Sequence, residues 1–392
     1  MFPLTRSKWH LLLATAALGW ACSPSEPPPE PLAQLPENKV HSASDCGRCH
    51  KSIHAAWKQS LHAAAVTDPL FQASFEEALE ITDGAARQTC LRCHAPTALL
   101  SDDWQMEQAA TRDGVSCDFC HSLTGNDFSQ PDHPFVIDPS PTQHGPVRDA
   151  ATLGHPVAFS EFFETSEHCA GCHEYTNPNG VALLQTYSEW ETYAERGGDK
   201  SCQQCHMPQV AAQIVDPKIH RVEGGFVNLH AMPGGHSMDQ LNRSIRLRIV
   251  ELESTGQGLR AVVRVHNSGA GHAVPTGIPT RKVILSLRAV SEDDNSEVRE
   301  ERVFERIMVD AQGEEILRDS RVFLEAVEET LDTRLAPMEE RLEEFDLDLT
   351  AQGNISVTAT LSYYYSPLNE VETERRFDFM SDTRRLTRRI RE

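Results

Sequence analysis

The sequence predicts an α+β protein, with a mostly α-helical, loop-rich first part and an all-β second part. Ten of its eleven cysteines occur in five copies of one short motif, all between residues 46 and 206. After residue 241 the sequence has no further cysteine, and apolar residues begin to alternate with polar ones. This alternation is typical of strands that bury one face. We therefore expect the two parts to fold as different domains.

The composition is that of a globular protein. The chain has 392 residues, of which 39% are hydrophobic and 24% charged. At about 100–200 residues per domain, this length suits two or three domains. Acidic residues outnumber basic ones by 58 to 36, which gives a formal charge of −22. Because such a surface repels phosphate backbones, we expect no nucleic-acid partner and instead expect protein partners with cationic patches.

Residues 1–21 have the pattern of a secretory signal peptide. Arg6 and Lys8 supply the positive start, residues 11–18 supply the apolar stretch, and residues 19–21 form a small-x-small cleavage site. The apolar stretch is too short to span a membrane comfortably. The sequence therefore predicts an exported protein.

Cys22 directly follows the cleavage site and lies outside the five motifs. Its position resembles the lipid-acceptor cysteine of bacterial lipoproteins, and the alternative is an ordinary cleaved signal followed by an incidental thiol. Residues 22–40 are rich in proline, which favours an extended tether over a packed core. Ser23 resembles a signal for sorting to the outer membrane. We expect a periplasmic or outer-membrane-attached protein that contacts the membrane through a lipid anchor.

The five cysteine motifs share the pattern Cys-x-x-Cys-His. Their residues are Cys46, Cys49 and His50; Cys90, Cys93 and His94; Cys117, Cys120 and His121; Cys169, Cys172 and His173; and Cys202, Cys205 and His206. Two thiols three positions apart can form thioethers with the two vinyl groups of one haem, and the adjacent histidine can bind its iron. The motifs therefore predict five covalently attached haem c groups with these histidines as proximal ligands.

Zinc sites and disulfides are the alternatives for paired cysteines in an exported protein. Histidine is only 18 of 392 residues, yet it follows every one of the five pairs. Chance does not account for this regularity, so the pattern favours haem. With about 32 residues of chain per motif, each haem has too little protein for a core of its own. We therefore expect the haems to pack against one another and to exchange electrons.

Histidines outside the motifs exceed the five that a second axial ligand on every iron requires, which favours bis-histidine ligation and low reduction potentials. Glycine and proline surround several of these histidines and permit close approach to a flat cofactor. His62 is expected on a helix that begins after the first motif. The candidate distal ligands are His62, His155, His230 and His272, followed by His144 and His236.

Three segments carry a family resemblance. They are the first motif with Trp57-x-x-Ser60-x-His62, the run Gly114-Val-Ser before the third motif, and Tyr187-x-Glu-Trp190 followed by the fifth motif and Met207-Pro208. Residues 41–241 thereby resemble multihaem cytochromes c of the cytochrome c-552/4 type. This group includes the tetrahaem electron acceptor of hydroxylamine oxidation and larger nitrite and hydroxylamine enzymes. The resemblance implies stacked haem pairs, and it implies distal-ligand roles for His62 and His230.

Two departures from that family favour an electron carrier over an enzyme. The nitrite-reducing branch carries a haem motif that ends in lysine, whereas every motif here ends in histidine. The sequence also offers no clear counterpart of the tyrosine that cross-links to the catalytic haem of hydroxylamine oxidation.

Residues 242–392 are predicted to form a β-sandwich of immunoglobulin-like type with a basic C-terminal tail. The alternating segments are residues 245–249, 263–265, 283–287 and 355–361. His272 lies in a Gly/Pro-containing loop between two of these segments, and we expect this loop to reach back and ligate a haem. The tail could dock on the acidic haem domain or on phospholipid head groups, or form a solvated helix end.

The leading hypothesis is an exported pentahaem cytochrome c that passes electrons between membrane-side and periplasmic or surface redox proteins. One alternative is a multihaem oxidoreductase that acts on a small nitrogen or sulfur species at a five-coordinate haem. A second alternative is a docking or adhesion protein that carries haems.

Overall fold

The computed structural model describes residues 40–388, except 131, 151–153, 222 and 366–375. The predicted signal peptide, the lipid-acceptor Cys22 and nearly all of the predicted tether therefore lie outside the described residues. The chain divides into Met1–Leu32 and Ala33–Glu392, and all described residues belong to the second unit. No helix in the described ranges combines the length and the apolar character needed to cross a membrane.

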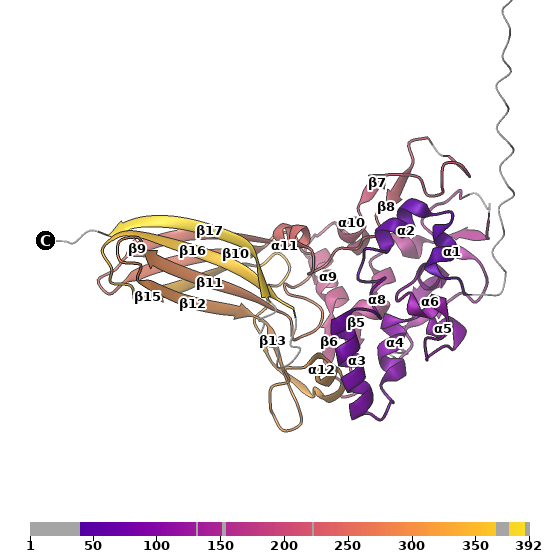
Figure 1. The fold of residues 1–392 in the computed structure, drawn as a ribbon, viewed down its shortest axis with the longest axis horizontal. Helices are drawn as coiled ribbons and strands as arrows, with labels where there is room; N and C mark the ends of the chain where they lie inside the picture. Colours follow the sequence, from indigo (N-terminus) through magenta and orange to yellow (C-terminus); the bar gives the residue numbers. More distant parts are fainter. Residues whose placement is uncertain (1–39, 131, 151–153, 222, 366–375, 389–392) are drawn as a thin grey trace, which may run out of the picture. The chain divides into compact units, whose positions relative to one another are not determined.

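The described residues from 40 to 244 form short helices joined by turns and two-stranded ribbons (Figure 1). The helices are α1 (Ala43–Gly47), α2 (Lys51–Trp57), α3 (Pro69–Ile81), α4 (Arg87–His94), α5 (Ala98–Ser101), α6 (Ala109–Arg112), α7 (Cys117–Ser122), η1 (Glu161–Glu164), α8 (Glu167–His173), α9 (Thr186–Glu195), α10 (Cys202–His206) and α11 (Met238–Ser244). The ribbons pair β1 (Leu123–Asn126) with β2 (Phe135–Ile137), β3 (Gln143–Gly145) with β4 (Val157–Phe159), β5 (Glu174–Thr176) with β6 (Ala182–Gln185), and β7 (Gln209–Ala211) with β8 (Phe226–Asn228).

Four of the five motifs lie within one short helix each, namely α4, α7, α8 and α10, and the first begins in α1. Residues three apart lie on the same face of a helix, so the two thiols of a motif can project toward one partner. Local sequence starts some of these helices. Ser201 and Gln204 form a capping box in which each side chain binds the other's backbone N–H, and α10 therefore begins at Cys202.

Seven strands form two antiparallel sheets in the C-terminal part. The first sheet has the order β15-β10-β9, with β9 (Ile245–Ser254), β10 (Leu259–Asn267) and β15 (Glu340–Leu347). The second has the order β12-β11-β16-β17, with β11 (Lys282–Ser291), β12 (Glu297–Phe304), β16 (Gly353–Tyr364) and β17 (Arg376–Arg388). The predicted alternating segments lie in β9, β10, β11 and β16. The presence of both helices and sheets confirms the α+β class.

The largest apolar core lies between these two sheets. Buried residues of both sheets form one cluster, which includes Ile249 and Val263 from one sheet and Leu285 and Leu361 from the other. The motif-bearing part holds only small clusters, such as the one around Phe119. Its helices therefore have little apolar core of their own, which agrees with a protein whose interior is completed by bound cofactors.

The region after residue 241 contains more than the predicted sandwich. A hairpin of β13 (Arg306–Val309) and β14 (Glu328–Asp332) leaves the sheets and carries α12 (Asp319–Glu325) between its strands. Met308 and Val322 from this segment are buried against Leu183 of β6. This segment joins the β-rich part to the motif-bearing part.

The predicted basic tail is a strand as far as residue 388. Within β17, Arg384 donates to the backbone oxygen of Val250 at 3.0 Å and Arg388 donates to that of Leu349 at 2.6 Å. Met380, on the same strand, packs against the core of the sandwich. The interpretation as a solvated helix end is therefore wrong for residues 384–388, which form part of strand β17, whereas docking on the haem domain or on phospholipid head groups stays a prediction.

The helix predicted to carry His62 ends earlier than expected. Helix α2 stops at Trp57, and a series of turns follows. The hydroxyl of Ser60 donates to the backbone oxygen of Trp57 at 2.7 Å and accepts from the backbone N–H of Ala63 at 3.2 Å. This side chain competes with the helical hydrogen bonds, so the helix ends and His62 lies in the turns.

Candidate haem-binding site

Four of the five proximal histidines are oriented by the same kind of contact. In each, the ring Nδ1 lies within hydrogen-bond distance of a backbone carbonyl oxygen. The acceptors are Ile214 for His50 (2.8 Å), Ala65 for His94 (3.0 Å), His144 for His121 (2.6 Å) and Pro233 for His206 (2.7 Å). A ring whose Nδ1–H donates to a carbonyl presents Nε2 to a metal, which is the usual arrangement of metal-binding histidines.

Three proximal histidines face a second histidine ring across a nearly constant separation. A metal–imidazole bond is about 2.0–2.1 Å long and a ring nitrogen lies about 1.1 Å from the ring centre, so two rings on opposite sides of one metal have centres about 6.3 Å apart. The observed pairs are His50 with His155 at 6.1 Å, His173 with His62 at 6.2 Å, and His206 with His272 at 6.3 Å. This spacing leaves room for one iron between the rings of each pair.

His230 has the features of a further ligand. Its Nδ1 lies 2.6 Å from the backbone oxygen of Asn228, as in the proximal histidines. Among the neighbouring histidines, His230 lowers the pKa of His121 most, after the larger effect of burial. Among the ring contacts of the described residues, His230 has none with a proximal histidine, so its role as a distal ligand stays a prediction.

The remaining two candidates occupy other positions. The Nε2 of His144 lies 2.8 Å from a carboxylate oxygen of Asp138, and its backbone oxygen accepts from His121. His144 thus orients a proximal ligand. Among the ring contacts of the described residues, His236 faces no proximal histidine. The structure brings three of the six candidate distal histidines, His62, His155 and His272, opposite proximal histidines.

Burial keeps these imidazoles neutral. Burial and, to a smaller extent, the neighbouring His173 together lower the pKa of His62 to about 3. Burial likewise lowers the pKa values of His121 and His173 to about 4. Because a histidine must be neutral to bind a metal, these environments suit ligation.

The second motif has a different neighbour. Phe71 of α3 stacks on the His94 ring, with centres 3.9 Å apart and planes 16° apart. Among the rings of the described residues, no histidine lies opposite His94 at the separation seen in the three pairs. The side of this haem site that faces away from His94 therefore has no histidine assigned to it.

The ten motif cysteines are free of disulfides. Three pairs of neighbouring thiols belong to different motifs, and in one of them Cys169 is the main cause that lowers the pKa of Cys202 to about 7. Similar thiol contacts join Cys46 to Cys117 and Cys93 to Cys172. The first motif therefore adjoins the third, and the fourth adjoins both the second and the fifth. Groups attached to neighbouring motifs would lie close together.

Two buried histidine nitrogens are available to donate hydrogen bonds to a bound group that carries acceptors. His41 Nε2 and His168 Nδ1 are buried without a hydrogen-bond partner among the described side chains. A buried donor without a partner is costly, and haem brings two propionate carboxylates. Together with the histidine pairs and the free thiols, these nitrogens indicate that the residues present fit haem c.

In the sequence Gly114 is only one residue of the run before the third motif, but in the structure it packs against the backbone of His62. Its φ is +71°, and a Cβ there would lie 2.5 Å from the backbone oxygen of His62. The next residue, Val115, donates its N–H to that same oxygen at 2.9 Å. Met232 also supports the ligand, because its sulfur lies 2.9 Å from His62 Nδ1. Such long-range supports leave no signal in the sequence.

We expect the substitution Gly114→Ala to displace His62 from its position opposite His173. The added methyl group collides with backbone, and a positive φ costs a residue other than glycine about 1–2 kcal/mol. Electron paramagnetic resonance should then show one haem changed from low spin to high spin. Gly84→Ala is the matched control, since Gly84 has φ +84° but no atom within 4 Å of its Cβ position. Equal spectra for the two variants would contradict this role.

Comparison with known proteins agrees with this site. The model of the family "Cytochrome c554 and c-prime" matches residues 45–122. The structure of a penta-haem cytochrome c552 from Thermochromatium tepidum is similar to this chain, with a TM-score of 0.71 and 22% sequence identity. The similarity covers 90% of this chain and 100% of that one. No curated protein matches the chain. The family match and the shared fold together support the identification of this chain as a multihaem c-type cytochrome.

Proposed function

We propose that this chain is an exported pentahaem cytochrome that transfers electrons between redox proteins. The observation that carries the proposal is the set of three histidine pairs with ring centres 6.1–6.3 Å apart. Histidines on both sides leave an iron no open position for a substrate and favour electron transfer at low potential. The count of five rests on the five motifs, each of which has its own proximal histidine.

The protein residues hold and orient the cofactors. When bound, haem supplies an iron that takes up and releases one electron. The motif thiols would attach it, the paired histidines would bind its iron, and the proximity of the motifs would bring neighbouring haems together. The neighbouring pairs Cys46–Cys117, Cys93–Cys172 and Cys169–Cys202 support two groups of adjoining haems, one at the first and third motifs and one at the second, fourth and fifth. No general base of the protein is required for this function.

The partners and the location are proposed from the sequence. A formal charge of −22 suits redox proteins that present cationic surfaces. The N-terminal signal and Cys22 support a lipid-anchored protein in the periplasm or at the outer membrane. The donor would lie on the membrane side and the acceptor in the periplasm or at the surface.

We also propose that the sandwich is of immunoglobulin-like type and serves the haem sites structurally. Its three-plus-four strand arrangement supports the type. Its loop carries His272, whose ring lies opposite that of His206. A strand-rich domain that supplies a ligand would make the two parts of the chain one functional unit.

The second candidate function is an oxidoreductase that acts on a small nitrogen or sulfur species. The surroundings of His94 favour it, because Phe71 stacks on this ring and no described histidine is placed opposite it. A haem with one protein ligand could bind nitrite or hydroxylamine. The two functions differ in how this one haem responds to such ligands.

We expect the purified protein to carry five covalent haems. Its mass should exceed that of the mature polypeptide by five haem groups, and the pyridine haemochrome spectrum should give the same count. Electron paramagnetic resonance should show low-spin ferric centres. A high-spin signal that shifts with nitrite, hydroxylamine or cyanide would favour the oxidoreductase, and a bare polypeptide or a zinc protein would refute both functions.

A further inference from the structure

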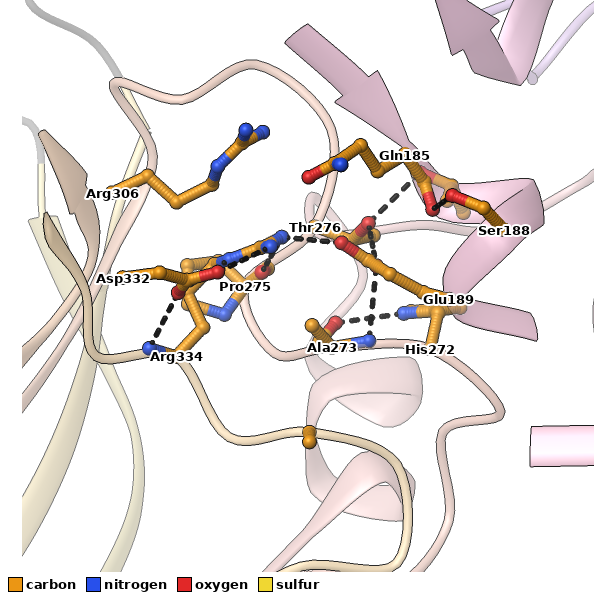
Figure 2. Close-up of polar contacts among 12 residues, drawn as sticks. Gln185, Ser188, Glu189, His272, Ala273, Pro275, Thr276, Arg306, Asp332 and Arg334 are labelled. Carbon is orange, nitrogen blue, oxygen red and sulfur yellow. Dashed lines mark hydrogen bonds and ion pairs between the residues drawn. The ribbon is translucent and has the colours of Figure 1, made fainter. Parts of the chain in front are cut away.

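A buried ion pair joins α9 to the β-rich part beside His272. Glu189 on α9 and Arg334 have only 11% and 7% of their side chains exposed. One carboxylate oxygen of Glu189 accepts from Nη1 of Arg334 at 2.6 Å. The other accepts from the backbone N–H of Ala273 at 3.0 Å and from the hydroxyl of Thr276 at 2.8 Å (Figure 2). One side chain of the motif-bearing part thus holds the loop at two points.

Ala273 connects this contact to His272. Its N–H is bound by Glu189, and its carbonyl oxygen lies 2.8 Å from Nδ1 of His272 (Figure 2). This hydrogen bond orients the imidazole and presents Nε2 to a metal. The ring then lies opposite His206, with the two planes only 21° apart. A shift of Ala273 would therefore move the ring of His272.

Arg334 is fixed in turn by the β-rich part. Its Nε and Nη2 bind the two carboxylate oxygens of Asp332 at 3.0 and 2.8 Å. This bidentate contact sets the plane of the guanidinium group, so Nη1 points at Glu189 (Figure 2). Nη1 also lies 3.4 Å from the backbone oxygen of Pro275 in the same loop.

A buried ion pair contributes little to stability when compared with apolar residues of the same size, because both charges must leave water. A buried ion pair instead fixes the geometry of the groups that it joins when its remaining donors and acceptors also have partners. Here they are filled by the N–H of Ala273, the hydroxyl of Thr276 and the carboxylate of Asp332. The contact is therefore suited to positioning the loop.

We propose that Glu189, held by Arg334, is the positioning residue that keeps His272 in place as the second axial ligand of the haem attached at Cys202 and Cys205. The inference rests on the proposed function, since it concerns a haem at the fifth motif. Without the carboxylate, residues 273–276 lose their attachment to α9. His272 then leaves the iron in a fraction of the molecules, and the potential of that haem rises.

The test compares four variants of the full-length, haem-loaded protein. Glu189→Ala removes both acceptors, and Glu189→Gln keeps an acceptor for Ala273 without the charge. Glu195→Ala removes the same charge from an exposed position on the same helix. His272→Ala gives the spectrum for complete loss of the ligand. Spin state is read by electron paramagnetic resonance, potential by spectroelectrochemistry, and haem content by pyridine haemochrome.

We expect Glu189→Ala to show part of the high-spin signal of His272→Ala, cyanide binding at one haem and a raised potential of that haem. Glu189→Gln should restore most of the low-spin signal, and Glu195→Ala should match the wild type. If Glu189→Ala does not accumulate, Arg334→Met tests the same contact and should move the spectrum in the same direction.

The outcomes distinguish the assignment of His272 as a ligand from the positioning role of Glu189. If the wild-type protein lacks haem, or if His272→Ala leaves every haem low-spin, the assignment of the ligand is wrong. If His272→Ala produces a high-spin haem while Glu189→Ala and Arg334→Met keep the spectrum and potential of Glu195→Ala, the ligand assignment stands and the positioning role is refuted.

Discussion

Replacing His272 by alanine should convert one haem from low spin to high spin. The ring of His272 lies 6.3 Å from that of His206, centre to centre, and no protein group is expected to take its place. A haem that loses one of two histidine ligands has a higher potential and an open position for cyanide. Electron paramagnetic resonance and redox titration of the oxidised protein measure both effects. This is the largest change that we expect from a single residue of the β-rich part.

His266→Ala is the matched control for this variant. His266 lies in β10 of the same domain, opposite Glu340 of β15 and Arg246 of β9 in the sheet register. It should leave all haems unchanged. If His272→Ala gave the same spectrum as His266→Ala, the loop would not supply a ligand, and the β-rich part would have no direct role at the haems.

Arg306→Met should strongly destabilise the folded protein. The guanidinium group, whose side chain is only 2% exposed, donates to the backbone oxygens of Leu183 at 2.8 Å and Ala182 at 2.7 Å. It also forms an ion pair with Glu329 of β14. Removing it leaves two backbone acceptors without their partner, at a cost of about 1–3 kcal/mol each, while the partly exposed carboxylate of Glu329 can be solvated. The measurement is the unfolding midpoint in denaturant of the haem-loaded protein.

Arg299→Met provides the comparison for this variant. Arg299 lies on β12 with 45% of its side chain exposed and pairs with Glu301 of the same strand. Such an exposed pair contributes at most about 1 kcal/mol. A midpoint for Arg306→Met equal to that of Arg299→Met would show that the contact between β13 and β6 is not important for stability.

The covalent chemistry could be predicted from the sequence because it is local. The two cysteines and the histidine of a motif lie within five consecutive residues, so their spacing alone indicates how one haem attaches. The strands of the sandwich were predictable for a similar reason. Alternation along β11 places Val283, Leu285 and Leu287 on one face, and all three are buried.

The local pattern was misleading where side-chain contacts compete with it. Ser60 ends α2 before His62, although the sequence favours a longer helix. The basic C-terminal residues also allowed a solvated helix end, but they form strand β17, where Arg384 and Arg388 bind backbone oxygens of the sandwich. The hairpin of β13 and β14 with α12 also left no pattern that separates it from a sandwich strand. At Ser60 the competing contact is local, whereas the contacts of β17 and of the hairpin join residues that are distant in the chain.

The amino-acid sequence by itself determined that five short segments can each attach a haem and that a strand-rich region follows them, because both properties depend on residues a few positions apart. Tertiary structure alone decided which histidine lies opposite which. His62 and His173, or His206 and His272, are far apart in the chain and come together only when the chain folds. It also decided that Glu189 meets Arg334, since a buried charge is stable only where the fold supplies its partner.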